Sequence, residues 1–135
     1  MQNQSLVEDH LSRCQHRLAA LQVLYERKSW ADVVRESQEI VELALKALLR
    51  YCNIEVPRLH DVSDILLEQR KRLPKKLEEH CDRLCEISRD LRRDRELSFY
   101  GSEDLTPSQF YKESDAIRAK ERAQWVAEIL TTHLK

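Results

Sequence analysis

The chain has 135 residues, the size of a single domain, and a formal net charge of −1. Its 1 Gly and 3 Pro leave few sites for tight turns and argue against a many-stranded β fold. The near-neutral charge excludes the overall positive charge typical of many nucleic-acid-binding proteins, so any anion site must be local. There is no apolar run near the ~18 residues of a membrane span and no signal-peptide pattern at the N-terminus. We therefore expect a cytoplasmic protein without membrane contact.

The first predicted helix runs from about Gln4 to Glu26. Its apolar residues recur at spacings of 3 and 4, which is typical of a helix in a bundle. They are Val7, Leu11, Cys14, Leu18, Leu21 and Tyr25.

The second predicted helix begins after Ser29, an expected N-cap, and ends near Cys52 and Asn53. It is strongly amphipathic, and one narrow stripe collects Trp30, Val34, Ser37, Val41, Leu45, Leu48 and Cys52. A polar row lies along one edge of that stripe and consists of Arg35, Gln38, Glu42 and Lys46. A polar row beside an apolar seam is a place where helix bundles build sites, so this row is a candidate site.

The remaining elements also indicate helices. Residues 53–60 form an expected loop with Pro57, and Asp61 caps a short helix that turns Ile65 and Leu66 inward. A helix over 74–97, a loop over 98–113 and a helix capped by Ser114 or Asp115 complete the chain. We predict one all-α domain over residues 1–135, an up-and-down four-helix bundle with one additional short helix.

Four cysteines, Cys14, Cys52, Cys81 and Cys85, fit reduced core positions in such a protein. His80 with Cys81 and Cys85, or His10 with Cys14, has helical spacing that suits metal ligands. The chain has no CxxC pair, so we expect neither a metal nor another cofactor.

The Arg-rich end of the fourth helix presents one arginine inward. Arg95 falls within about 20° of Leu84 on the apolar stripe, whereas Arg89 and Arg93 point to solvent. An inward Arg needs a partner or an anion, and Glu42 is the natural candidate partner. Either Arg95 and Glu42 form a structural pair, or Arg95 is held ready for a phosphate.

Two further features are ambiguous. The segment Arg70–Lys76 carries five basic residues and no acidic one. It is either a solvent-exposed corner without a ligand or a binding surface for RNA or for an acidic partner. Tyr100 lies five residues after Arg95 and beside the only glycine. It is either an anchored aromatic residue or part of a site.

The second helix, the following Ile54–Pro57 segment, His60-Asp61 and the late Arg-rich helix together resemble the HEPN domain (higher eukaryotes and prokaryotes nucleotide-binding) over about residues 10–133. The resemblance implies a homodimeric helical bundle, often paired with a minimal nucleotidyltransferase as a toxin–antitoxin system. It also implies, for active members, a metal-independent ribonuclease with an Arg followed after four to six residues by His. Here Arg95 matches the motif Arg, but Tyr100 stands in the place of His.

The resemblance leaves three functions open. The first is a homodimer that binds a nucleotide or RNA phosphate with little or no catalysis, beside a nucleotidyltransferase partner. The second is a metal-independent ribonuclease that uses Arg95 and Tyr100, and the third is a non-catalytic adaptor whose polar row only sets helix register. A tyrosine with a pKa of about 10 is a poor base near neutral pH, which disfavours the enzyme. The expected phosphate- or nucleotide-binding residues are Arg95, Arg92, Glu42, Gln38 and Lys46.

Overall fold

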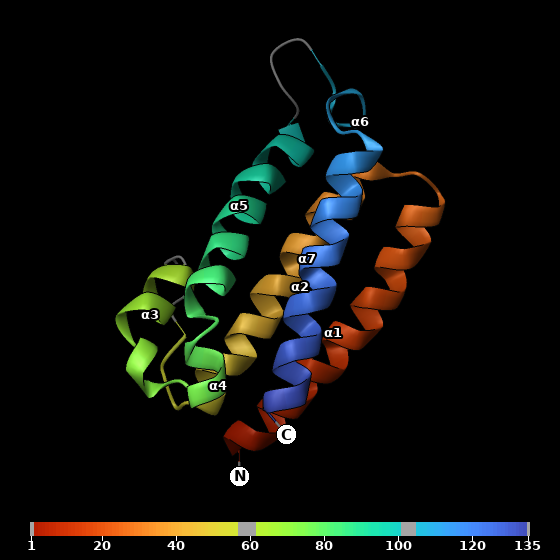
Figure 1. The fold of residues 1–135 in the computed structure, drawn as a ribbon. Coiled ribbons are helices and arrows are strands. Elements are labelled where there is room, and N and C mark those ends of the chain that lie inside the picture. The colour runs from red at the N-terminus through yellow and green to blue at the C-terminus, as the bar shows by residue number, and fades with distance from the viewer. Residues whose placement is uncertain (1, 57–61, 101–104, 135) are drawn as a thin grey trace.

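The computed structural model describes the backbone of residues 2–56, 62–100 and 105–134, and the side chains of residues 4–56, 62–94 and 105–134. Every regular element in these ranges is a helix, which confirms the predicted all-α class (Figure 1). The elements are α1 (Gln2–Glu26), α2 (Trp30–Tyr51), α3 (Val62–Glu68), the 3₁₀ turn η1 (Arg70–Arg72), α4 (Lys75–Glu78), α5 (Cys81–Tyr100), α6 (Pro107–Phe110) and α7 (Glu113–His133).

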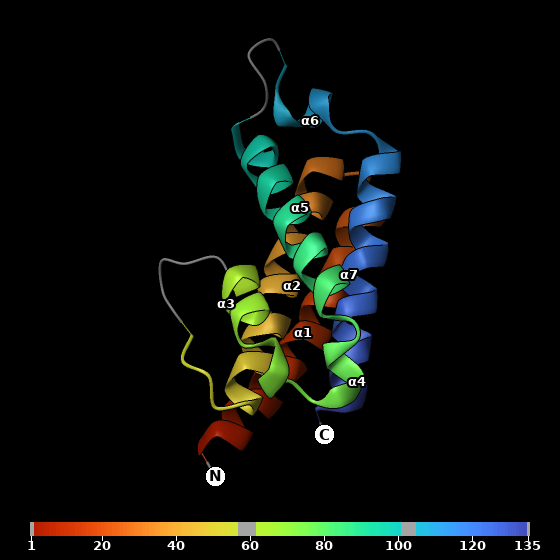
Figure 2. The ribbon, with the colours of Figure 1, turned by 60° about the vertical axis from the view of Figure 1, so that its left-hand side comes forward.

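Four long helices, α1, α2, α5 and α7, run alternately up and down (Figure 1). Helix α2 is central and packs against α1, α7 and α5. Helices α3 and α4 lie near the end of the bundle where α1 begins and α7 ends, and α6 lies at the opposite end (Figure 2). Because α1 and α5 flank α2 without packing closely on each other, α2 keeps one face that no long helix covers.

The apolar stripe predicted for α2 forms the centre of the core. Val41, Leu45 and Leu48 are almost fully buried, and Trp30 and Cys52 at its two ends are partly buried. Burial of this stripe against three helices stabilises the fold, since each fully buried aliphatic side chain contributes about 1.5–3 kcal/mol. None of the described helices has both the length and the apolar character needed to cross a lipid bilayer.

Helix α2 ends in a Schellman motif that places the next segment. Asn53 adopts a left-handed φ of 57°, its N–H donates to the Arg50 carbonyl, and the Ile54 N–H donates to the Leu49 carbonyl at 2.8 Å. Asn tolerates this conformation better than most residues, as expected for the predicted helix end. Buried Ile54 then fixes the direction in which the chain leaves α2.

The predicted helix over 74–97 differs from the structure. It is divided into α4 and α5 by a turn at Glu79 and His80, where the His80 N–H donates to the Leu77 carbonyl at 3.0 Å. No Gly or Pro marks this break. The break keeps both Leu77 and Cys81 buried, and it lets the His80 ring pack edge-on against Trp125. Tertiary packing therefore determines where the helix is interrupted.

The predicted loop over 98–113 is shorter than expected, because α5 continues to Tyr100 and a capped turn forms α6. Thr106 and Gln109 make a reciprocal capping box around this turn. The last helix begins at Glu113, not after Ser114 or Asp115. Asp115 lies inside its first turn and accepts a hydrogen bond from the Lys112 N–H at 2.9 Å.

All four cysteines are free thiols, and three of them, Cys14, Cys81 and Cys85, are buried in the core. The Cys85 Sγ donates to the Ser63 carbonyl, and burial raises the pKa of Cys85 to about 12. Cys81 and Cys85 therefore behave as core groups that join α5 to α3, whereas the Cys14 Sγ donates to the Ile40 carbonyl and joins α1 to α2. In the described ranges, no group of three or more His, Cys, Asp or Glu residues could hold a metal ion.

Candidate functional site: the α1–α2 pocket

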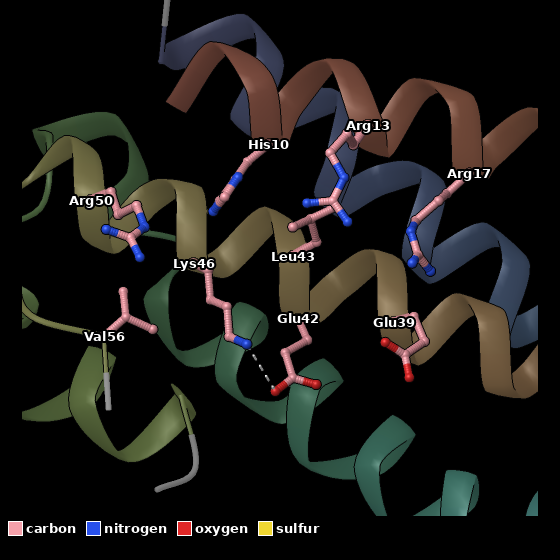
Figure 3. A pocket seen from close by; sticks show the side chains of 9 residues that line it. All are labelled: His10, Arg13, Arg17, Glu39, Glu42, Leu43, Lys46, Arg50 and Val56. Carbon is pink, nitrogen blue, oxygen red and sulfur yellow. Dashed lines mark ion pairs between the residues drawn. The ribbon is translucent and has the colours of Figure 1, made fainter. Parts of the chain in front are cut away.

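The uncovered face of α2 carries a pocket of about 430 Å³ in the seam with α1, here called the α1–α2 pocket (Figure 3). Its size falls in the range of small-molecule sites. It is lined by His10, Arg13, Arg17, Glu39, Glu42, Leu43, Lys46, Arg50 and Val56. Two further hollows adjoin the pocket: one shares Arg17 and Glu39 with it, and the other, at the C-terminal end of α2, shares Arg50 and Val56. The result is an extended polar groove along α2.

Glu42 is held by its own helix. Its carboxylate accepts a hydrogen bond from Gln38 Nε2 at 2.8 Å and forms an ion pair with Lys46 Nζ at 3.7 Å. Figure 3 shows Glu42 and Lys46 projecting from α2 on the side away from α1. Gln38, Glu42 and Lys46 therefore form an ordered chain of contacts, and the Glu42 side chain is three-quarters buried.

On the α1 side, Arg17 is also partly neutralised. Its Nη1 lies 3.1 Å from Glu36 Oε1 and 3.2 Å from Oε2, which ties α1 to α2. Arg13 and Arg50 differ from Arg17, because neither forms an ion pair with another residue in the described part of the chain. With four cationic side chains against two carboxylates, the lining has a local positive excess that comes from Arg13 and Arg50.

His10 lies between Arg50 and Arg13 on the wall formed by α1 (Figure 3). Its side chain is only 13% exposed, and its Nδ1 has no hydrogen-bond partner among the described residues. The Asp9 carboxylate is 3.9 Å from Nδ1, which is too long for a hydrogen bond. Burial, and then the charges of Arg50 and Arg13, lower the pKa of His10 below its usual value. The imidazole is therefore kept neutral among cations.

The structure brings together three of the residues that the sequence singled out. Gln38, Glu42 and Lys46 make direct contacts, and the last two line the pocket. Gln38 is buried, and its Oε1 has no partner among the described residues.

Of the three site residues predicted on α5, the structure describes the side chain of Arg92 alone. Arg92 is partly exposed on this helix and has an interaction partner. Arg95 and Tyr100 belong to the same helix, but their side chains lie outside the described ranges. The expected pair of Arg95 with Glu42 therefore stays a prediction. Pro57, His60 and Asp61 of the expected loop and cap also lie outside these ranges.

The last described turn of α5 is held by contacts from α6 and α7. The buried Tyr111 hydroxyl donates to the Asp94 carbonyl, and Arg122 Nη1 lies 3.1 Å from an Asp90 oxygen. These contacts fix the direction of α5 just before Arg95.

Two other arginines of α5 have the exposure expected from the sequence. Arg93 is 72% exposed. Arg89 is half exposed, yet its Nε donates to the buried Ser63 hydroxyl at 3.1 Å and its Nη2 contacts Asp64 at 3.0 Å. Arg89 therefore clamps α3 onto α5, which the helical angle alone did not indicate.

The basic corner Arg70–Lys76 is partly structural. Arg70 pairs with Asp82 at 3.2 Å, and Arg72 Nη2 donates to the carbonyls of Cys52 and Asn53 that end α2. Lys71, Lys75 and Lys76 are exposed.

Sequence reasoning missed the arginines that line the pocket, Arg13, Arg17 and Arg50, and considered His10 only as a possible metal ligand. A signal was present in the spacing. His10, Arg13 and Arg17 recur at intervals of 3 and 4 on α1, and Leu43, Lys46 and Arg50 do so on α2. Each set marks one face of its helix, but only the packing shows that these two faces meet.

Comparison with known proteins supports the resemblance seen in the sequence. The family model described as the HEPN domain matches residues 7–133, which is nearly the whole chain. The chain belongs to the HEPN domain family. Neither the curated proteins nor the solved structures that were compared contain a significant match. The bundle described above is therefore the helical architecture of a HEPN domain, with a cationic pocket on the uncovered face of its central helix.

Proposed function

We propose that this HEPN domain binds a nucleotide or an RNA phosphate in the groove along α2. The observation that carries the proposal is the excess of cationic side chains in the α1–α2 pocket of a chain whose net charge is −1. Arg and Lys side chains that lack a carboxylate partner favour an anion, and arginine in particular suits phosphate. The continuation of the pocket into two further hollows gives room for a ligand longer than one phosphate.

The ordered polar row contributes a second kind of contact to the proposed site. Lys46 offers an ammonium group to the ligand, and Glu42 offers carboxylate oxygens that accept hydrogen bonds from hydroxyl or amino groups. Gln38 holds Glu42 in place, so it acts as a positioning residue. In the proposal, Arg92 and Arg95 of α5 add the remaining phosphate contacts.

The proposed biological form is a cytoplasmic homodimer that acts beside a minimal nucleotidyltransferase in a toxin–antitoxin-type pair. This part rests on the family resemblance. Tyr100 stands where active members carry the motif His, so we propose that the domain has little or no ribonuclease activity. A metal-independent ribonuclease with Arg95 and Tyr100 is the second candidate, favoured by the five-residue spacing of these two residues.

Binding is tested by fluorescence anisotropy with a short labelled RNA and by calorimetry with nucleoside monophosphates. Lys46→Ala is expected to weaken binding about tenfold, because one charge-assisted contact is lost. Lys75→Ala, which removes the same charge from an exposed position on α4, is the matched control and is expected to leave binding unchanged. Absence of binding to every probe, or equal effects of the two variants, would reject the proposal.

Catalysis is tested on the same RNA with a metal chelator present. The proposal predicts no cleavage above the background of Arg95→Ala. Cleavage that Arg95→Ala and Tyr100→Phe both abolish would instead establish the ribonuclease. RNA that neither binds nor is cut, together with co-purification of a second chain, would favour the adaptor.

A further inference from the structure

The cationic excess of the α1–α2 pocket is concentrated at one end. Arg13 and Arg50 lack ion-pair partners among the described residues, and they flank the His10 imidazole (Figure 3). Glu39 and Glu42 lie farther along α2 from Arg50. The pocket therefore has a positive end near His10 and a carboxylate-bearing end near Glu42.

The positive end also contains hydrogen-bonding groups that are buried without partners. His10 Nδ1 and Arg50 Nε are both inaccessible to solvent, and neither is hydrogen-bonded to a described residue. A buried polar atom without a partner lowers stability, and a bound group that forms a hydrogen bond with it would offset that loss. Two such atoms beside the Arg13 guanidinium, which has no ion-pair partner among the described residues, give this end of the pocket the chemistry of an anion site.

We propose that the His10, Arg13 and Arg50 end of the α1–α2 pocket is a subsite for a terminal phosphate, the phosphomonoester group of a nucleotide or of a 5′-phosphorylated RNA end. The inference rests on the proposed function and adds the part of the ligand that this end recognises. A phosphomonoester carries a charge of about −1.5 to −2 and three acceptor oxygens near neutral pH. It matches two unpaired guanidinium groups, whereas an internal phosphodiester carries only about one negative charge.

His10 can couple phosphate binding at this subsite to protonation of its own imidazole. Arg13 on α1 and Lys46 and Arg50 on α2 oppose protonation of the imidazole, and Asp9 alone favours it. A dianion bound among these cations offsets their effect, so the ring takes up a proton and donates it in a hydrogen bond to a phosphate oxygen. Binding of the phosphate and protonation of His10 should therefore favour each other.

The binding test compares one RNA sequence with a 5′-phosphate and with a 5′-hydroxyl, beside the corresponding nucleoside 5′-monophosphate and nucleoside. The terminal phosphate is expected to tighten binding about 10- to 100-fold, and Arg13→Gln and Arg50→Gln are expected to remove that difference. Arg27→Gln, the same change at an exposed position near the end of α1, is the matched control and should preserve it. Thermal unfolding of each variant verifies that it is folded.

A second readout needs no substitution in the protein that is titrated. The ring signal of His10, assigned with His10→Gln among the 5 histidines, is followed by NMR against pH with and without inorganic phosphate. Phosphate is expected to move the titration midpoint of His10 upward, while the other histidines keep theirs.

The outcomes separate this inference from the proposed function. If RNA binds equally with a 5′-phosphate and a 5′-hydroxyl, and phosphate does not shift the His10 titration, the subsite is refuted while RNA binding stands. If RNA and nucleotides fail to bind but inorganic phosphate shifts the His10 signal, the anion subsite is supported and the proposed function fails. If phosphate shifts all five histidines equally, the effect is non-specific and the subsite is refuted.

Discussion

Truncating two leucines of α2 tests the orientation of this helix, on which the site depends. Leu48 is completely buried, whereas Leu43 is partly exposed and lines the α1–α2 pocket. Leu48→Ala removes three buried carbons, worth about 2.4 kcal/mol of transfer free energy at ~0.8 kcal/mol each, and adds the cost of a closed cavity. We expect a total loss of about 3–4 kcal/mol in the free energy of unfolding.

Leu43→Ala is the same chemical change on the same helix, but it opens into an existing pocket. It leaves no closed cavity and removes less surface from water, so we expect a loss of about 1 kcal/mol. Urea unfolding followed by circular dichroism measures both losses. In thermal melts, Leu48→Ala should lower the Tm by about 10 °C, given the unfolding entropy of a chain this long.

Equal losses from the two variants would refute the orientation of α2, because they would mean that both leucines are buried alike. The protein concentration provides a further control. A Leu43→Ala loss that grows with concentration would indicate that a second copy covers this face in solution.

Three further predictions concern single side chains. The pKa of His10 is lowered in the folded state, so protonation of this residue favours unfolding. The free energy of unfolding should therefore fall as the pH drops below 6.5, the usual pKa of histidine. Urea titrations at several pH values measure this slope, and His10→Gln should flatten it. Asn53→Gly should keep or raise the Tm and Asn53→Ala should lower the free energy of unfolding by about 1 kcal/mol, because the residue has a left-handed φ; similar Tm values for both variants would contradict the motif. Arg89→Met should lower the free energy of unfolding by about 1 kcal/mol and speed amide exchange in α3, because the hydrogen bond from Arg89 to the buried Ser63 hydroxyl is lost. Arg93→Met, at an exposed position, should change neither the free energy of unfolding nor the exchange rate.

The sequence was sufficient to predict two of the long helices closely. The period of the apolar residues and the rare Gly and Pro predict α1 and α2 within a few residues, because these signals are local and α2 in particular has a sharply divided surface. The same reasoning correctly located the Gln38, Glu42 and Lys46 row, since neighbours on one helix face are fixed by helical geometry.

The break between α4 and α5 was not predictable in this way. The turn at His80 has no local signal and depends on contacts with Trp125 of α7, a helix far along the chain. The role of Arg89 is similar, because its partner Ser63 belongs to α3.

What the amino-acid sequence determined by itself is the helical class, the apolar face of each long helix and the family. The tertiary structure alone decided where the charged faces meet. His10 and Arg13 on α1 and Arg50 on α2 are ordinary surface residues when each helix is considered separately. They form one cationic end of a pocket because α1 packs against α2 in a register that brings them together, while α5 packs on the other side and leaves this seam uncovered. The relative placement of two helices depends on long-range packing of the core, and no local pattern in either helix specifies it.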